Sequence, residues 1–69
     1  MDAFFKVWDR ARKLYDLERL VKVNFDEAKI RIIYQGQIIV RADGEYTELE
    51  IMYTQAAQRL ATWLQQKGA

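Results

Sequence analysis

The spacing of the apolar residues changes twice along the chain, and this change constrains the fold more than any other sequence feature. From Asp2 to about Arg19 apolar residues recur every three or four positions, which is typical of a helix with one buried stripe. The stripe consists of Phe4, Val7, Trp8, Ala11, Leu14 and Tyr15. The same spacing returns after Thr54, a suitable N-cap residue, and continues to about Lys67. The sequence therefore predicts a helix at each end.

Between these helices apolar and polar residues alternate, which is the pattern of half-buried strands. The predicted strands are residues 30–34, 38–42 and 49–53; residues 21–25 are a fourth strand in one alternative and are unpaired in the other. The dipeptide Asp43-Gly44 predicts a tight type I′ hairpin before the last strand. The expected fold is α+β: an antiparallel β-meander of three or four strands flanked by an N-terminal and a C-terminal helix, in the order α-β-β-β(-β)-α.

Two amphipathic helices and one amphipathic sheet are best buried when both helices pack on one sheet face. A chain of 69 residues allows one domain, residues 1–69. A three-residue loop, Gln35-Gly36-Gln37, keeps the core positions of the two middle strands opposite one another. On that register Ile33 lies opposite Ile39, and Arg31 lies opposite Arg41.

The sheet face without helices is the predicted binding surface. It combines exposed apolar residues with a basic corner and an acidic strand, and contiguous exposed apolar residues indicate contact with another molecule. The expected partner-binding residues are Arg31, Ile33, Ile39, Arg41, Tyr46, Glu48 and Met52. The alternative is ordinary surface, because single exposed apolar side chains are common. The Arg31–Arg41 pair could likewise form an anion site, or it could be neutralised by Glu48 and Glu50.

Several residue types are absent, and their absence argues against catalysis. The chain has no Cys, His, Pro or Ser, so it lacks the common acyl-transfer nucleophiles and the usual general base near neutral pH. Without Cys and His no ordinary zinc, haem or iron–sulfur site is expected. The carboxylates of Glu48 and Glu50 lie on an open strand face without catalytic partners. We therefore expect no enzyme activity, no cofactor and no metal.

The net charge and the hydropathy of the chain indicate its cellular location and the kinds of partner that it could bind. The net charge of +1 provides no field that would attract nucleic acid or an anionic membrane. The N-terminal sequence MDAFFKVWDR lacks the apolar region of a signal peptide, and no window approaches about 18 apolar residues. Together with the absence of Cys, these features predict a cytoplasmic protein without a membrane segment.

The leading functional hypothesis is a non-enzymatic protein-interaction module, such as an adaptor, inhibitor or regulatory subunit. Its partner is another protein or a second copy in a homodimer. One alternative is nucleic-acid binding, because the α-β-β-β-α order is similar to that of the double-stranded RNA-binding domain. That family's basic cluster falls at about Thr54 to Gln58, where this sequence reads TQAAQ and has no Lys. A further alternative is a phage-encoded inhibitor or a de novo designed protein.

Overall fold

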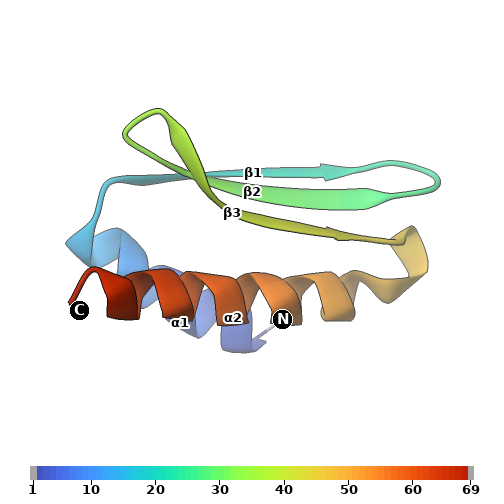
Figure 1. The fold of residues 1–69 in the computed structure, drawn as a ribbon. Coiled ribbons are helices and arrows are strands. Elements are labelled where there is room, and N and C mark those ends of the chain that lie inside the picture. The colour runs from blue at the N-terminus through green and yellow to red at the C-terminus, as the bar shows by residue number, and fades with distance from the viewer. Residues whose placement is uncertain (1, 69) are drawn as a thin grey trace.

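The computed structural model describes residues 2–68 and has two layers, one of strands and one of helices (Figure 1). Its elements are α1 (Asp2–Leu14), β1 (Leu17–Val23), β2 (Ala28–Tyr34), β3 (Gln37–Gly44), the 3-10 helix η1 (Tyr46–Glu48) and α2 (Leu49–Gln66). Within these residues, the sheet is antiparallel with the order β1-β2-β3. Both α1 and α2 lie on one side of it (Figure 1). The predicted α+β class and the three-strand form of the order, α-β-β-β-α, are confirmed.

The first helix is shorter than predicted, and the first strand begins earlier. α1 ends at Leu14, not near Arg19, and β1 covers residues 17–23 in place of 21–25. Leu17 then pairs with Tyr34 and Val23 with Ala28, so every residue of β1 has a partner on β2. The interrupted apolar stripe after position 15 marks the end of the helix, because those residues follow the two-residue period of a strand.

The predicted strand at residues 49–53 is wrong, and so is the hairpin at Asp43-Gly44. β3 continues through Gly44, and α2 begins at Leu49 after the single turn of η1. Met52 is buried in line with Ala56 and Leu60, so the helical stripe begins before Thr54. The absence of a side chain at Gly44 allows β3 and α2 to lie close together, because a Cβ built there would lie 3.1 Å from the Cβ of Met52. The first turn of α2 can therefore pack against the end of β3.

The loop between β2 and β3 has two residues, not the predicted three. Gln35 and Gly36 both have positive φ, 52° and 79°, as a type I′ turn requires. The register shifts between Ile32 and Ile33, so that Ile33 pairs with Ile38. Ile39 is the extra residue of a β-bulge in β3. The bulge restores the predicted pairs nearer the middle of the sheet: Ile30–Ala42, Arg31–Arg41 and Ile32–Val40.

One cluster of buried side chains fills the space between the layers. Its members are Phe4, Trp8, Ala11, Ala28, Ile30, Ile32, Val40, Ala42, Met52, Ala56, Ala57, Leu60 and Leu64. The ring centroids of Phe4 and Tyr53 lie 5.3 Å apart and join α1 to α2. At the other end of the layers Trp63 lies 5.1 Å from Tyr15 and 5.2 Å from Tyr34, again between ring centroids. Apolar and aromatic packing therefore holds the helices to the sheet.

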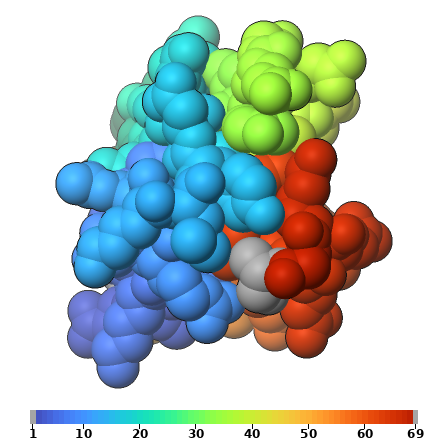
Figure 2. All heavy atoms as spheres, turned by 90° about the vertical axis from the view of Figure 1, so that its left-hand side faces the viewer, coloured from blue at the N-terminus to red at the C-terminus, as the bar shows by residue number. Residues whose placement is uncertain are grey.

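The end-on view shows α1 (blue) and the end of α2 (red) side by side below the strands (Figure 2). α2 packs against β3 and β2, whereas α1 packs chiefly against α2. Within residues 2–68, neither helix has the length and hydropathy needed to cross a bilayer.

Candidate protein-binding surface

The outer face is the side of the sheet that faces away from the helices. Side chains alternate along a strand, so the buried side chains of Ile30, Ile32 and Val40 define the inner side, and their neighbours define the outer face. Its residues are Glu18, Leu20 and Lys22 on β1, Lys29, Arg31 and Ile33 on β2, and Ile38, Arg41 and Asp43 on β3. The surface is open along its whole length because both helices lie on the other side.

The outer face is apolar at the end next to the β2–β3 turn. Ile33 lies directly opposite Ile38, and the partner of Ile33 on β1 is Glu18, two residues from Leu20. The exposed fractions are 57% for Leu20 and 45% for Ile38, while Ile33 is half-buried on the central strand. Ile33 therefore occupies its predicted place. Ile39 does not, because the bulge moves it: its half-buried side chain packs against the core, and Ile38 takes the exposed position.

Arg31 and Arg41 lie opposite one another, as predicted, but the two guanidinium groups have different surroundings. Arg31 forms an ion pair with Asp43, with an Nη2–Oδ1 distance of 2.9 Å. Its Nη1 also donates hydrogen bonds to the backbone carbonyls of Ile30, at 2.9 Å, and Ala42, at 3.3 Å. Among residues 2–68 no carboxylate pairs with the Arg41 side chain. Asp43 therefore neutralises Arg31, in place of the glutamates considered from sequence, and the positive charge of Arg41 remains.

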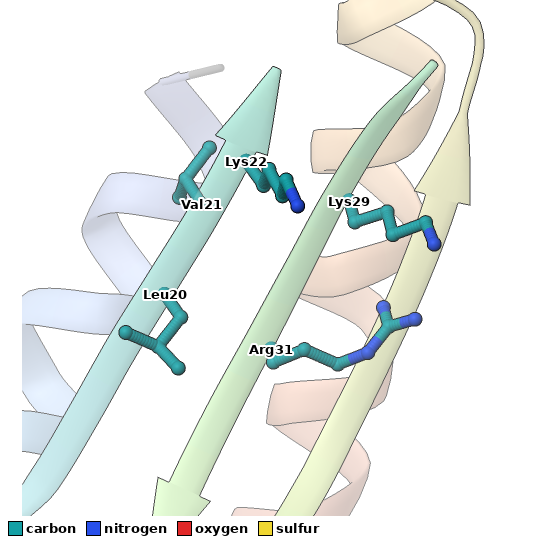
Figure 3. Close-up of a pocket in the computed structure, with 5 residues that line it drawn as sticks. All are labelled: Leu20, Val21, Lys22, Lys29 and Arg31. Carbon is teal, nitrogen blue, oxygen red and sulfur yellow. The ribbon is translucent and has the colours of Figure 1, made fainter. Parts of the chain in front are cut away.

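The outer face carries more cations than carboxylates. Its cations are Lys22, Lys29, Arg31 and Arg41, and its carboxylates are Glu18 and Asp43. Glu27, in the adjoining turn, pairs with Lys29 at an Nζ–Oε1 distance of 3.6 Å. Figure 3 shows Lys22 on β1 beside Lys29 on β2, with Arg31 extending toward β3. These side chains line an open hollow of about 420 Å³ together with Leu20 and Val21. Such a surface suits a partner that presents carboxylates beside an apolar contact.

Besides Ile39, three of the predicted binding residues lie outside this face. Tyr46 and Glu48 are exposed, but they belong to η1 and not to a strand. Met52 is fully buried because it begins the inward stripe of α2, so its assignment to a binding surface is wrong. The error follows directly from assigning residues 49–53 to a strand.

The turn between β1 and β2 presents an aromatic residue that the sequence pattern placed in a strand. Phe25 is 93% exposed. The Oδ1 of Asn24 accepts hydrogen bonds from the backbone N–H groups of Asp26, at 3.3 Å, and Glu27, at 3.1 Å. This Asx-type turn holds Phe25 outward. Asn24 was the residue in the sequence that could have indicated a turn here in place of a continued strand. Phe25 and Tyr46 line a second open hollow of about 580 Å³.

Among residues 2–68 no group of three or more acidic side chains is placed to hold a metal ion. Comparison with family models, with curated proteins and with solved structures yields no match.

Proposed function

We propose that the chain is a small, non-enzymatic protein-interaction module, such as an adaptor, inhibitor or regulatory subunit, whose outer face binds a partner protein. The observation that carries this proposal is the apolar patch formed by the exposed Leu20 and Ile38 and the half-buried Ile33, which extends over all three strands. Solvated sheet faces usually carry polar residues at such positions, and a rimmed apolar patch is typical of an interaction site.

The charge of the outer face favours an acidic partner. Four cations lie on one side of the apolar patch; Lys29 pairs with Glu27 and Arg31 with Asp43, whereas no carboxylate within residues 2–68 pairs with Arg41. A second copy packed face to face would bring together two surfaces that each carry an excess of cations, which is unfavourable. The supported partner is therefore a different protein with an apolar surface beside Asp or Glu residues.

Nucleic-acid binding is the weaker candidate. The element order agrees with that of the double-stranded RNA-binding domain, but residues 54–58 of α2, where that family's basic cluster falls, read TQAAQ and contain no Lys. A domain without this cluster binds the phosphate backbone weakly.

The test begins with a tagged form of the native chain, which is used to isolate a partner protein. The partner is then purified, and calorimetry measures its affinity for two single-substitution variants of the chain. Ile38→Glu replaces an exposed apolar contact with a charge that repels acidic groups, so we expect the dissociation constant to rise at least about tenfold. Gln58→Glu adds the same charge on the exposed side of α2 and should change affinity less than twofold. Thermal melts verify that both variants fold. Equal affinities of the two variants, or salt-sensitive binding to duplex RNA in place of protein binding, would contradict the proposal.

A further inference from the structure

We propose that β1 is the docking edge for an extended peptide segment of the partner, which adds a fourth, antiparallel strand to the sheet above α1. The inference rests on the proposed function, since it requires a protein partner. It concerns the free edge of β1, defined as the side of the strand away from β2, and not the outer face.

The helix layer is wider than the sheet. Three strands that each occupy about 4.8 Å span about 14 Å across the sheet, whereas two packed helices span about 20 Å including their side chains. α2 packs under β3 and β2, so α1 is displaced toward β1. Figure 3 shows α1 behind β1 and extending past it on the side away from β2. A fourth strand beside β1 would therefore lie above α1.

Apolar side chains near this position are incompletely covered. On the inner side of β1, Val21 is 41% exposed and Val23 is 44% exposed, and Phe5 on α1 is 38% exposed. The guanidinium carbon of Arg19 lies over the rings of Phe5 and Trp8, at 5.2 and 5.1 Å from their centroids. Alternate side chains of an added strand would cover the two valines and Phe5, as neighbouring strands do elsewhere in such a layer.

The backbone of β1 presents a regular template. The Asn24 N–H donates to the Glu27 carbonyl at 2.9 Å, which marks a hydrogen-bonded pair. Because such pairs alternate in an antiparallel ladder, the N–H and C=O groups of Arg19, Val21 and Val23 point away from β2. Among residues 2–68 no side chain hydrogen-bonds to these groups, and β1 contains no bulge. Unpaired, regular edges of this kind accept an added strand.

The side chains of β1 specify the chemistry of the occupant. Glu18, Leu20 and Lys22 alternate on the outer face, while Arg19 and Val21 point toward the helices. A complementary antiparallel strand carries a carboxylate opposite Lys22 and Arg19, and a cation opposite Glu18. It carries apolar residues opposite Leu20 and Val21, because cross-strand pairs of this kind stabilise a sheet. The occupant is thus an extended peptide in which charged and apolar residues follow this order.

A second copy of the chain fits this edge less well. Antiparallel pairing of β1 with itself about Leu20 would place Glu18 opposite Lys22 of the copy. However, α1 lies below the position of the added strand, so the α1 helices of the two copies would meet at the two-fold axis and overlap. A peptide without a helix at that place avoids the collision.

The test uses a synthetic peptide with capped ends and the order Val-Glu-Val-Leu-Glu-Lys-Leu, which matches residues 23 to 17 in antiparallel register. The control peptide has the same apolar residues with each charge reversed. Titration into the isotopically labelled chain, followed by NMR, should show binding at least about tenfold tighter for the matched peptide. Its binding should slow hydrogen exchange of the Arg19, Val21 and Val23 amides. The Leu20 and Lys22 amides, already bonded to β2, should change little.

Three results would overturn the inference: no binding at millimolar peptide, equal binding of the two peptides, or shifts confined to the outer face. A concentration-dependent dimer with protected β1 edge amides, detected by light scattering and exchange, would assign the edge to a second copy and also overturn it. These failures are distinct from failure of the proposed function, because the Ile38→Glu comparison does not depend on the edge of β1.

Discussion

The two edges of the sheet differ in how the rest of the molecule treats them. The edge of β3 lies above α2, contains the bulge at Ile39, and has a guanidinium hydrogen bond from Arg59 to its Arg41 carbonyl. β1 has an unbroken register, no such side-chain cap within residues 2–68, and exposed residues at nearly every position. Bulges and covering side chains are common ways of preventing unwanted strand pairing. β3 therefore has two features that oppose the addition of a strand, and β1 has neither of them.

The difference originates in the helices. α2 has 18 residues and a buried stripe that packs on β3 and β2, whereas α1 has 13 residues and packs chiefly on α2. The second helix therefore stabilises one half of the sheet, while the first leaves β1 without full cover. Four substitutions test this comparison, in decreasing order of expected effect.

Leu60→Ala should produce the largest change in stability, because it removes a central side chain from the contact between α2 and the sheet. Leu60 is fully buried between α2 and the sheet. We expect a loss of about 2–5 kcal/mol in the free energy of unfolding, measured by urea denaturation. Ile51→Ala, at an exposed position of the same helix, is the control and should cost less than about 0.5 kcal/mol. A loss below 1 kcal/mol for Leu60→Ala would contradict the packing of α2 on the sheet.

The bulge of β3 predicts opposite outcomes for adjacent residues. Ile39→Glu places a charge against the core and should lower the free energy of unfolding by about 1–3 kcal/mol. Ile38→Glu, on the outer face, should change it by less than about 0.5 kcal/mol. Circular dichroism melts of the two variants decide the question, and the reverse order of stability would mean that the bulge is placed wrongly.

Arg59→Ala should weaken the edge of β3. It removes the hydrogen bond to the Arg41 carbonyl, at a cost of about 0.5–1.5 kcal/mol in denaturation experiments. Arg10→Ala is the control, because it removes the same charge from an exposed position of α1. If both substitutions have the same small effect, the cap contributes nothing and the two edges differ less than proposed.

Phe25→Ala should have the smallest effect on folding. Its side chain is exposed at the turn that follows β1, so the free energy of unfolding should change by no more than about 0.5 kcal/mol. A loss of more than 1 kcal/mol by thermal melting would show that this end of β1 supports the fold.

Much of the fold follows from local periodicity. The helices, the central strands and the pairs Ile30–Ala42 and Ile32–Val40 were predictable because their apolar residues have a single spacing. Residues 49–53 were not, since Leu49, Ile51 and Tyr53 alternate like a strand by coincidence. The spacing of Met52, Ala56 and Leu60 was the better signal, because it continues through α2.

The candidate site was predictable only in part. Arg31, Ile33 and Arg41 were assigned to the outer face correctly, because they alternate with core residues. The exposure of Ile38 in place of Ile39 depends on the bulge, which allows the two-residue turn and the core register to coexist. The open edge of β1 depends on the lateral position of α1 under the sheet, a tertiary feature that no local pattern encodes.

The most direct test of the account exchanges one charge across the β1 edge. Two peptides of the matched order, differing only in Glu or Lys opposite Lys22, are titrated into the native chain and into Lys22→Glu. The native chain should prefer the Glu peptide about threefold, and Lys22→Glu should prefer the Lys peptide by a similar factor, because only the cross-strand pair changes. A preference that does not invert would contradict the docking of a fourth strand on β1.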